Sequence, residues 1–170
     1  NDGDTLLPQG ENLAAFLYNV HEKSVVNYNL IIRTIQTVAP YFRDFYLKPD
    51  ENGNITLKWQ DKFCENVYGT TDLSDGTIRF IALTTLFLQP DLPQTIILDE
   101  PELGLHPVAI AKLSGMIKSI ASKGCQIIIA TQSAQLVSEF SPEDIIIAEN
   151  KNGATNLSHP KPEIIKEWIK

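Results

Sequence analysis

The sequence predicts an α/β fold: a mostly parallel sheet with flanking helices, preceded by a helical pair and a β-hairpin. From about residue 71 onward, short apolar runs alternate with stretches of helical periodicity. Runs of this kind are typical of strands that are covered on both faces, and strand–helix alternation implies right-handed crossovers between parallel strands. The 170 residues suffice for one ordinary domain with a core of its own.

The first 60 residues predict the helical pair and the hairpin. Apolar side chains recur at i, i+3, i+4 and i+7 in two sets, and Pro40 closes the pair. The two sets are Leu13, Phe16, Leu17 and Val20, then Tyr28, Ile31, Ile32 and Ile35. Two short strands, 45–48 and 55–59, flank the turn-rich segment 49–54, which indicates an antiparallel hairpin.

The remaining elements follow from periodicity and from Pro and Gly positions. Residues 74–88 are apolar nearly all round, which predicts a buried helix. A second helix begins at Pro107 and ends at Gly124. The other expected elements are parallel strands at 95–98, 126–130 and 144–148, a short helix at 133–139, a hairpin turn at Asn152-Gly153 and a terminal amphipathic helix over 161–170.

Charge and composition narrow the functional classes. The net charge of −7 argues against a large phosphate-binding surface on this segment, because nucleic-acid affinity depends on Lys and Arg. No apolar stretch approaches the roughly 18 residues that span a bilayer, and the start lacks the pattern of a signal peptide. We therefore expect a cytoplasmic protein without membrane contact. Because the chain starts on Asn1 rather than Met, a processed or truncated product is expected.

Asp99 and Glu100 are the first candidate site. These adjacent carboxylates follow an apolar strand, at the edge where open α/β sheets bind ligands. One carboxylate there can hold Mg²⁺, directly or through water, and its neighbour can polarise an attacking water. The alternative is a polar loop that simply opens after the strand.

The start of the helix at 74–88 is the second candidate. Ser74 is a good N-cap, and Gly76 leaves the amides of the first turn open to close approach. A helix N-terminus of this kind attracts phosphate. The alternative is an ordinary capped core helix.

Three segments together resemble one family. The run from Ile96 to Pro107 resembles the Walker B and D-loop segment of ABC-type ATPases of the RecF-like and SMC-like branch. Residues 73–77 look like the signature motif of that superfamily, and 130–133 lie where it has its switch loop. The resemblance is strong over about 70–150 and weak over the first 60 residues. It implies the P-loop NTPase fold, in the form of an ABC-type head.

The resemblance also implies roles, cofactors and a partner. Asp99 would act on Mg²⁺, Glu100 would be the catalytic base and Gln132 would lie at the switch position. The signature residues would bind, in trans, the γ-phosphate of ATP held by a partner subunit, so that a homodimer encloses two ATP molecules. The signature comprises Leu73, Ser74, Asp75, Gly76 and Thr77, and the D-loop at the interface comprises Glu102, Leu103, Gly104, Leu105 and His106.

Two positions depart from the family pattern, and one has two interpretations. Gln132 stands where the family usually has His; an amide can donate a hydrogen bond but cannot take up a proton. Asp75 replaces the first signature glycine and adds a negative charge near a phosphate site. His106 can belong to the D-loop or simply cap the helix that begins at Pro107.

The chain contains no Gly-x-x-x-x-Gly-Lys-Ser/Thr segment, which supplies the phosphate cradle in such enzymes. The resemblance places the P-loop and the Q-loop upstream of Asn1, so the fragment alone is expected to be inactive. We expect one domain portion with a helical and hairpin part at 1–70, a motif core at 71–150 and a terminal part at 151–170.

The leading hypothesis is therefore an ATPase that hydrolyses ATP with Mg²⁺ and serves a DNA-related process such as repair, chromosome maintenance or phage defence. The DNA setting rests on fold-level analogy. The alternative is a non-catalytic ATPase-like module for assembly, and a third possibility is an unrelated doubly wound domain.

Overall fold

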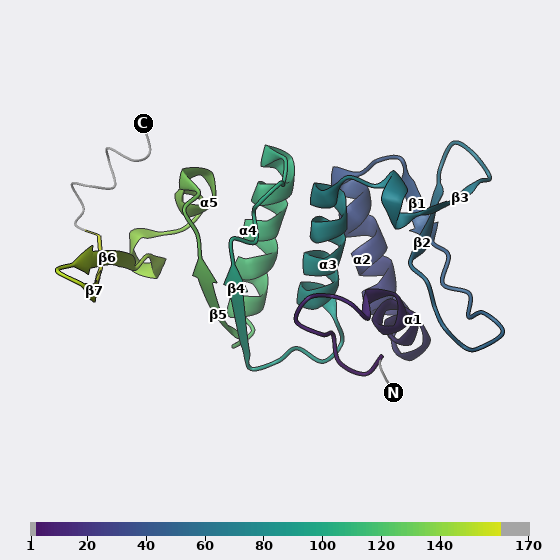
Figure 1. Ribbon diagram of the computed structural model, residues 1–170, viewed down its shortest axis with the longest axis horizontal. Helices are drawn as coiled ribbons and strands as arrows, with labels where there is room; N and C mark the ends of the chain where they lie inside the picture. The colour runs from purple at the N-terminus through teal and green to yellow at the C-terminus, as the bar shows by residue number, and fades with distance from the viewer. Residues whose placement is uncertain (1–2, 161–170) are drawn as a thin grey trace.

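The computed structural model describes residues 3–160 and arranges their elements along one long axis (Figure 1). Helix α3 (Asp75–Leu88) lies between α2 (Val25–Val38) and α4 (Pro107–Ala121), and it separates two lobes. We call α1 (Leu13–Lys23), α2 and the antiparallel strands the first lobe. The second lobe comprises α4, the parallel strands and α5 (Ala134–Ser138).

The first lobe confirms the helical pair and the antiparallel hairpin, but the strand bounds differ. The strands are β1 (Phe42–Phe45), β2 (Lys58–Asp61) and β3 (Val67–Gly69), in the order β1-β2-β3, and β3 was not predicted. Between β1 and β2, Asp50 accepts hydrogen bonds from the amides of Asn52 and Asn54 at 2.9 and 2.8 Å. Such local bonds compete with strand pairing, which explains why the expected strands shift away from this turn.

Aromatic side chains of the three strands fill the outer part of the first core. Trp59 is 5% exposed and stacks on Phe42 and Tyr68, with ring centroids 5.9 and 5.0 Å apart. Its indole N–H donates to the carbonyl of Gly69 at 3.0 Å, which satisfies the polar end of the buried ring. These contacts fix β3 against β2 although β3 has only three residues.

Helix α3 is apolar on almost every side because both lobes pack against it. Ile81 belongs to the core of the first lobe, whereas Phe80, Leu83 and Phe87 belong to the core of the second. The expectation of a buried helix is confirmed. Gln89 follows its last residue and Pro90 lies just beyond, in agreement with the predicted end.

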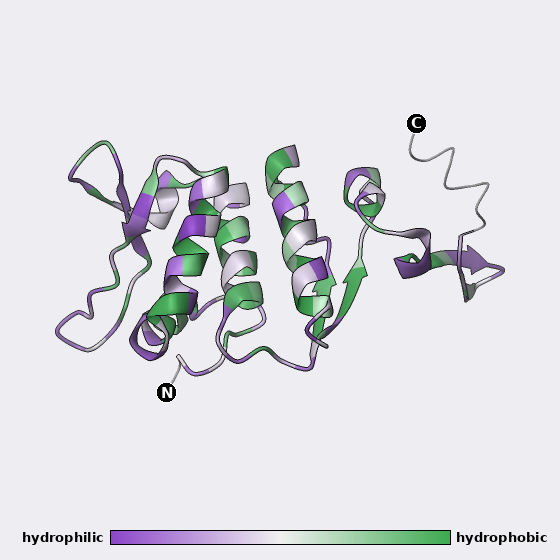
Figure 2. Cartoon of the chain, turned by 180° about the vertical axis from the view of Figure 1, so that it is seen from behind, coloured by the Kyte–Doolittle hydropathy of each residue, from purple (hydrophilic) through white to green (hydrophobic). Residues whose placement is uncertain are grey.

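The second lobe contains two parallel strands, β4 (Thr95–Asp99) and β5 (Gln126–Ala130), paired in register from Thr95↔Gln126 to Asp99↔Ala130. Figure 2 shows both strands in the colour of hydrophobic residues. Helix α4 covers one face through side chains such as Leu113, which is fully buried. The other face exposes Ile97 at 74% and its register partner Ile128 at 49%.

The expected third parallel strand at 144–148 was wrong. The chain instead forms a 3₁₀ turn at Pro142–Asp144, and β6 (Ile147–Lys151) pairs with β7 (Ala154–Ser158) in an antiparallel hairpin. The predicted turn at Asn152-Gly153 is confirmed, and both residues have positive φ, 56° and 85°. Such a two-residue turn returns the chain at once, so β6 satisfies its hydrogen bonds with β7 rather than with β5. The expected terminal helix lies outside the described residues.

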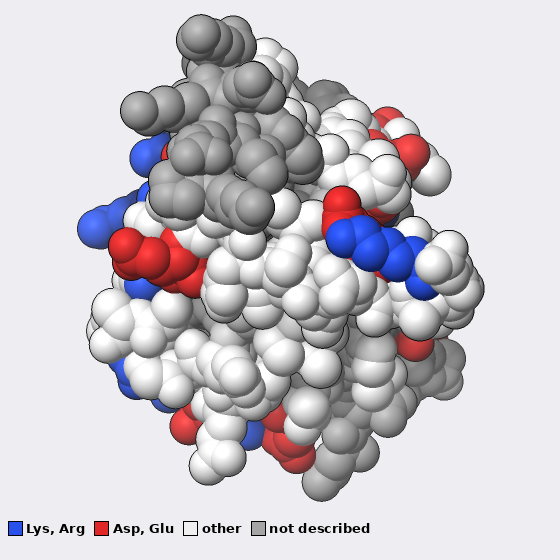
Figure 3. All heavy atoms as spheres, turned by 90° about the vertical axis from the view of Figure 1, so that its left-hand side faces the viewer, with Lys and Arg blue, Asp and Glu red and all other residues white. Residues whose placement is uncertain are grey.

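Across residues 3–160, no helix is long and apolar enough to cross a membrane. The end of the molecule that carries β6 and β7 shows charged side chains scattered around its margin, with few across its centre (Figure 3).

Candidate functional site

The carboxyl ends of β4 and β5 bring two of the predicted site residues into contact. The amide of Glu100 donates to the carbonyl of Ala130 at 2.8 Å, so the pairing of the strands continues one residue beyond β4. Immediately after β5, the side-chain amide of Gln132 donates to Oε1 of Glu100 at 3.2 Å. The sequence separates these side chains by 32 positions, and the parallel register joins them.

The backbone of Glu100 has a conformation that is rare for a residue with a side chain. Its φ is 43°, in the left-handed region, which costs of order 1–3 kcal/mol for such residues and is common at functional sites. Its carbonyl accepts hydrogen bonds from the amide of Leu103 at 3.1 Å and from Nη1 of Arg79 at 3.0 Å. Together with the bond to Ala130, these contacts fix the direction in which the carboxylate leaves the chain.

Arg79 was not among the predicted site residues. It lies on α3 and reaches across to the end of β4, 21 positions later in the sequence. The available signal was its position: it is the one basic residue in a helix that has only one other charged residue, Asp75. An arginine there must find a partner, and in the structure it finds the carbonyl of Glu100.

The predicted signature segment starts α3 as expected. Ser74 is the N-cap: its hydroxyl accepts from the amide of Thr77 at 3.2 Å and lies 2.9 Å from the Thr77 hydroxyl. Leu73 is buried, at 8% exposure, and anchors the approach to the helix. Asp75 and Gly76 form the beginning of the first turn.

Gly76 and Gly104 bring the predicted signature and D-loop segments together within one chain. A Cβ on Gly76 would lie 2.2 Å from the carbonyl oxygen of Gly104, so this contact requires glycine. Gly104 itself has a φ of +76° and turns the chain sharply. The start of α3 therefore rests directly on the turn that follows β4.

The rest of the predicted D-loop connects β4 to α4. The amide of Leu105 donates to the carbonyl of Glu102 at 2.9 Å, and Leu103 is 58% exposed. His106 is the N-cap of α4, where its Nδ1 accepts from the amide of Val108 at 3.4 Å. The structure thus confirms that His106 caps α4, and this cap does not remove it from the predicted D-loop segment.

Asp99 is exposed at the end of β4, beside Glu100. In the part of the chain that the structure describes, no three His, Cys, Asp or Glu side chains gather as a metal cage. This donor set fits Mg²⁺ held with phosphate, because Mg²⁺ uses one or two carboxylates together with phosphate oxygens and water.

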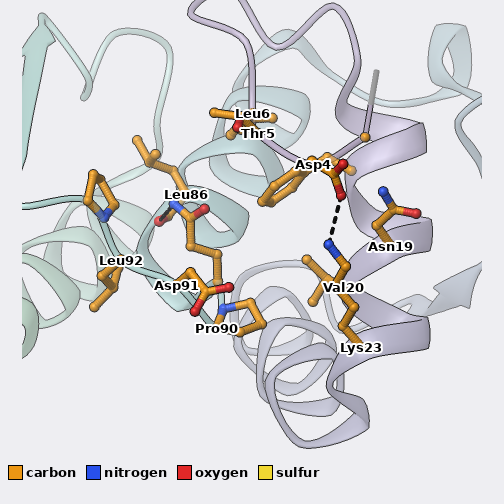
Figure 4. Close-up of a pocket in the computed structure, with 14 residues that line it drawn as sticks. Asp4, Thr5, Leu6, Asn19, Val20, Lys23, Leu86, Pro90, Asp91 and Leu92 are labelled. Carbon is orange, nitrogen blue, oxygen red and sulfur yellow. Dashed lines mark hydrogen bonds and ion pairs between the residues drawn. The ribbon is translucent and has the colours of Figure 1, made fainter. Parts of the chain in front are cut away.

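A hollow of about 360 Å³ lies elsewhere, between the N-terminal segment, α1 and the loop after α3 (Figure 4). Lys23 and Asp4 form an ion pair across it at 2.7 Å. The hydrogen bond from Lys23 lowers the pKa of Asp4 and raises that of Lys23. None of the predicted site residues lines this hollow.

Residues 23–138 match the protein family described as "AAA domain, putative AbiEii toxin, Type IV TA system". Among curated proteins, the chain is 28% identical over 136 residues to an energy-coupling factor transporter ATP-binding protein, EcfA2, of Lactobacillus delbrueckii subsp. bulgaricus, covering 75% of this chain and 45% of that protein. A second EcfA2, from Staphylococcus epidermidis, is 29% identical over 114 residues, covering 63% and 39%. The chain thus spans less than half the length of the curated relatives that it matches.

Solved structures with a similar fold are heads of SMC proteins. One, from a study of ATP-driven dimerisation and DNA-stimulated activation of SMC ATPases, has a TM-score of 0.64 at 16% identity, covering 91% of this chain and 98% of that one. The Smc head of Pyrococcus yayanosii has a TM-score of 0.66 at 16% identity, covering 95% and 32%. At these identities the likeness concerns the fold alone.

Proposed function

This chain belongs to the AAA-domain family whose model it matches, and we propose that it is part of an ABC-type, SMC-like ATPase, to which it supplies the Walker B, D-loop, switch and signature residues for hydrolysing ATP. Members of this broad group bind ATP with Mg²⁺. The observation that carries the proposal is the contact between Glu100 and Gln132 at the carboxyl ends of β4 and β5.

In the proposed mechanism, Glu100 is the catalytic base. Its carboxylate takes a proton from the water that attacks the γ-phosphate, which adds general-base assistance to the attack. Gln132 orients that carboxylate through its side-chain amide and does not itself take a proton. The fixed backbone of Glu100 keeps the carboxylate at the sheet edge in an orientation prepared for the reaction.

Asp99 would hold Mg²⁺, which neutralises charge on the phosphates when it is bound with ATP. The start of α3, from Leu73 to Thr77, would bind the γ-phosphate held by a second subunit, since helix N-termini favour anions. The D-loop, from Glu102 to His106, would then lie at the interface of a homodimer. Its contact with Gly76 supports this arrangement, because the two segments would meet the partner as one unit.

The phosphate cradle must come from a P-loop, and we propose that a segment of the same full-length protein provides it. The open face of β4 and β5 suits such a segment, because Ile97 and Ile128 are exposed there side by side. We also propose a DNA-related role for that protein. With a net charge of −7, this chain is a poor DNA-binding surface, so DNA contacts would lie in other parts.

Substitution of Glu100 in the full-length protein tests the proposal. Glu100→Gln should lower ATP turnover by about 100-fold or more, since general-base assistance contributes 10²–10⁴-fold. The Kd of a fluorescent ATP analogue should stay within about threefold of wild type, because the base acts on the transition state and does not hold the bound ATP. The ATP-dependent dimer, followed by analytical ultracentrifugation, should persist longer. Glu143→Gln, an exposed carboxylate on the turn before β6, is the control and should behave as wild type.

Two results would contradict the proposal. Wild-type turnover by the Glu100→Gln variant would remove Glu100 as the base. A wild-type protein that dimerises with ATP but does not hydrolyse it would favour the alternative, a non-catalytic assembly module.

A further inference from the structure

Glu102 is a buried carboxylate that the mechanism above does not use. It lies in the turn between β4 and α4 and is only 9% exposed. Its Oε2 is buried without a hydrogen-bond partner among the described residues. Carboxylates are expensive to bury, so a glutamate at such a position requires a reason beyond filling space.

The other oxygen of Glu102 supplies that reason. The hydroxyl of Thr131, the first residue after β5, donates a hydrogen bond to Oε1 of Glu102. The same hydroxyl accepts from the amide of Ser133 at 3.0 Å. Ser133 in turn caps α5, where its hydroxyl accepts from the amide of Leu136 at 3.2 Å.

These bonds fix the two neighbours of Gln132. Thr131 is tied to Glu102, and Ser133 is tied both to Thr131 and to α5. Gln132 itself is exposed, and its side-chain amide donates a hydrogen bond to Glu100. An exposed amide side chain has many rotamers, so its reach toward Glu100 depends on how its own backbone is held.

We propose that Glu102 is a positioning residue for Gln132: through the Thr131 hydroxyl it holds the switch segment so that the amide of Gln132 meets Glu100. The role rests on the proposed function. Charge-assisted bonds are shorter and roughly twice as strong as neutral ones, which makes a carboxylate better than an amide at this point. Glu102 lies in the turn that would face a partner subunit. Through Thr131 and Gln132 it would thus influence Glu100, the base that would act on ATP bound to this chain.

The test uses turnover and ATP binding by the full-length protein. Thr131→Val removes the hydroxyl at nearly constant volume and should lower kcat about tenfold or more, with KM for ATP changed less than about threefold, because positioning acts on the reacting geometry. Thr131→Ser keeps the hydroxyl, and its kcat should lie within about threefold of wild type. Glu102→Ala should resemble Thr131→Val, and the double variant should be no slower than either, since the two residues act as one unit. Glu102→Gln, which keeps an acceptor oxygen, should fall in between.

A matched control exists in the same lobe. The Ser114 hydroxyl on α4 donates to the carbonyl of Ala111 at 2.9 Å and lies 3.2 Å from Oε2 of Glu139, and neither contact touches a site residue. Ser114→Ala should leave kcat unchanged. Hydrogen exchange at the Ser133 and Leu136 amides should quicken in Thr131→Val and Glu102→Ala but not in Ser114→Ala.

Wild-type kcat in Thr131→Val, or a loss that Thr131→Ser does not repair, would overturn the role of Glu102. Changes in kcat and in the unfolding midpoint of Ser114→Ala that equal those of Thr131→Val would overturn it as well, because any buried hydroxyl bond in this lobe would then matter equally. Absence of turnover in the wild-type protein would sink the proposed function instead. In that case the exchange rates alone decide whether Glu102 and Thr131 hold the switch segment.

Discussion

The two lobes on either side of α3 differ in where they expose apolar residues. In the first lobe, Leu17, Ile31, Ile35 and Phe42 are all fully buried, and the strands close over them. In the second, α4 covers one face of β4 and β5, while Ile97 and its partner Ile128 stay exposed on the other. The first lobe also exposes large apolar residues, at Val25, Val26 and Leu30 on α2 and at Phe63 between β2 and β3, but not as a register pair of a parallel sheet.

The two lobes also differ in their share of the candidate site. The site residues lie in the second lobe or at the start of α3, and the first lobe supplies none. The antiparallel strands of the first lobe bury Phe42, Phe45 and Trp59 in its core, whereas the parallel strands of the second lobe present a polar edge and an apolar face. We propose that another segment of the full-length protein packs on this face.

The largest expected effect is the loss of a fully buried leucine from each lobe. Leu17→Ala and Leu113→Ala should each lower the free energy of unfolding by about 3 kcal/mol, through lost burial and a residual cavity. Urea unfolding measures the cost. Hydrogen exchange then separates the lobes: Leu113→Ala should release protection in β4 and β5 while α1 and α2 keep theirs.

Identical loss of protection over the whole chain in both variants would mean that the lobes unfold as one unit. The lobes would then differ only in which apolar residues they expose, and not in how their cores unfold.

A smaller effect is expected where the second lobe meets α3. Gly76→Ala should destabilise the chain by about 1–3 kcal/mol, because the new methyl group lies 2.2 Å from the Gly104 carbonyl and forces the turn to shift. Gly115 is the control: its added Cβ meets nothing within 4 Å, and it lies on the exposed side of α4. Gly115→Ala should stabilise by about 0.5–1 kcal/mol, as expected for glycine in a helix interior. Thermal unfolding of both variants measures the sign.

Equal shifts of the two midpoints would show that the Gly76–Gly104 contact yields without cost. The signature and D-loop segments would then be independent, and their joint presentation to a partner subunit would lose its support.

The sequence predicted local elements across the chain better than the internal contacts of the site. Ser74 as a cap, the end of α2 before Pro40 and the Asn152-Gly153 turn all follow from local chemistry, and the structure has them. The prediction of a third parallel strand at 144–148 was wrong, because an apolar run does not indicate which neighbouring strand it pairs with. A hairpin turn a few residues later decided that pairing.

Arg79 and Glu102 show why the contacts could not be derived. The guanidinium of Arg79 reaches a carbonyl 21 positions away, and the carboxylate of Glu102 meets a hydroxyl 29 positions away. Periodicity reports which face of an element is apolar, but not which two elements lie side by side. Only the register of β4 on β5 and the packing of α3 against the turn fix these pairs.

The smallest effect concerns the open sheet face. In this chain, Ile97→Thr should change the free energy of unfolding by less than about 0.5 kcal/mol, since the side chain is already 74% exposed, and it should reduce self-association in sedimentation velocity. In the full-length protein the same change should cost about 1–3 kcal/mol, because a covered face would bury the hydroxyl without a partner. Val26→Thr, at a side chain 80% exposed on α2, should cost little in both contexts. If Ile97→Thr costs as little in the full-length protein as in this chain, nothing covers this face. The open sheet face would then not distinguish the second lobe from the first.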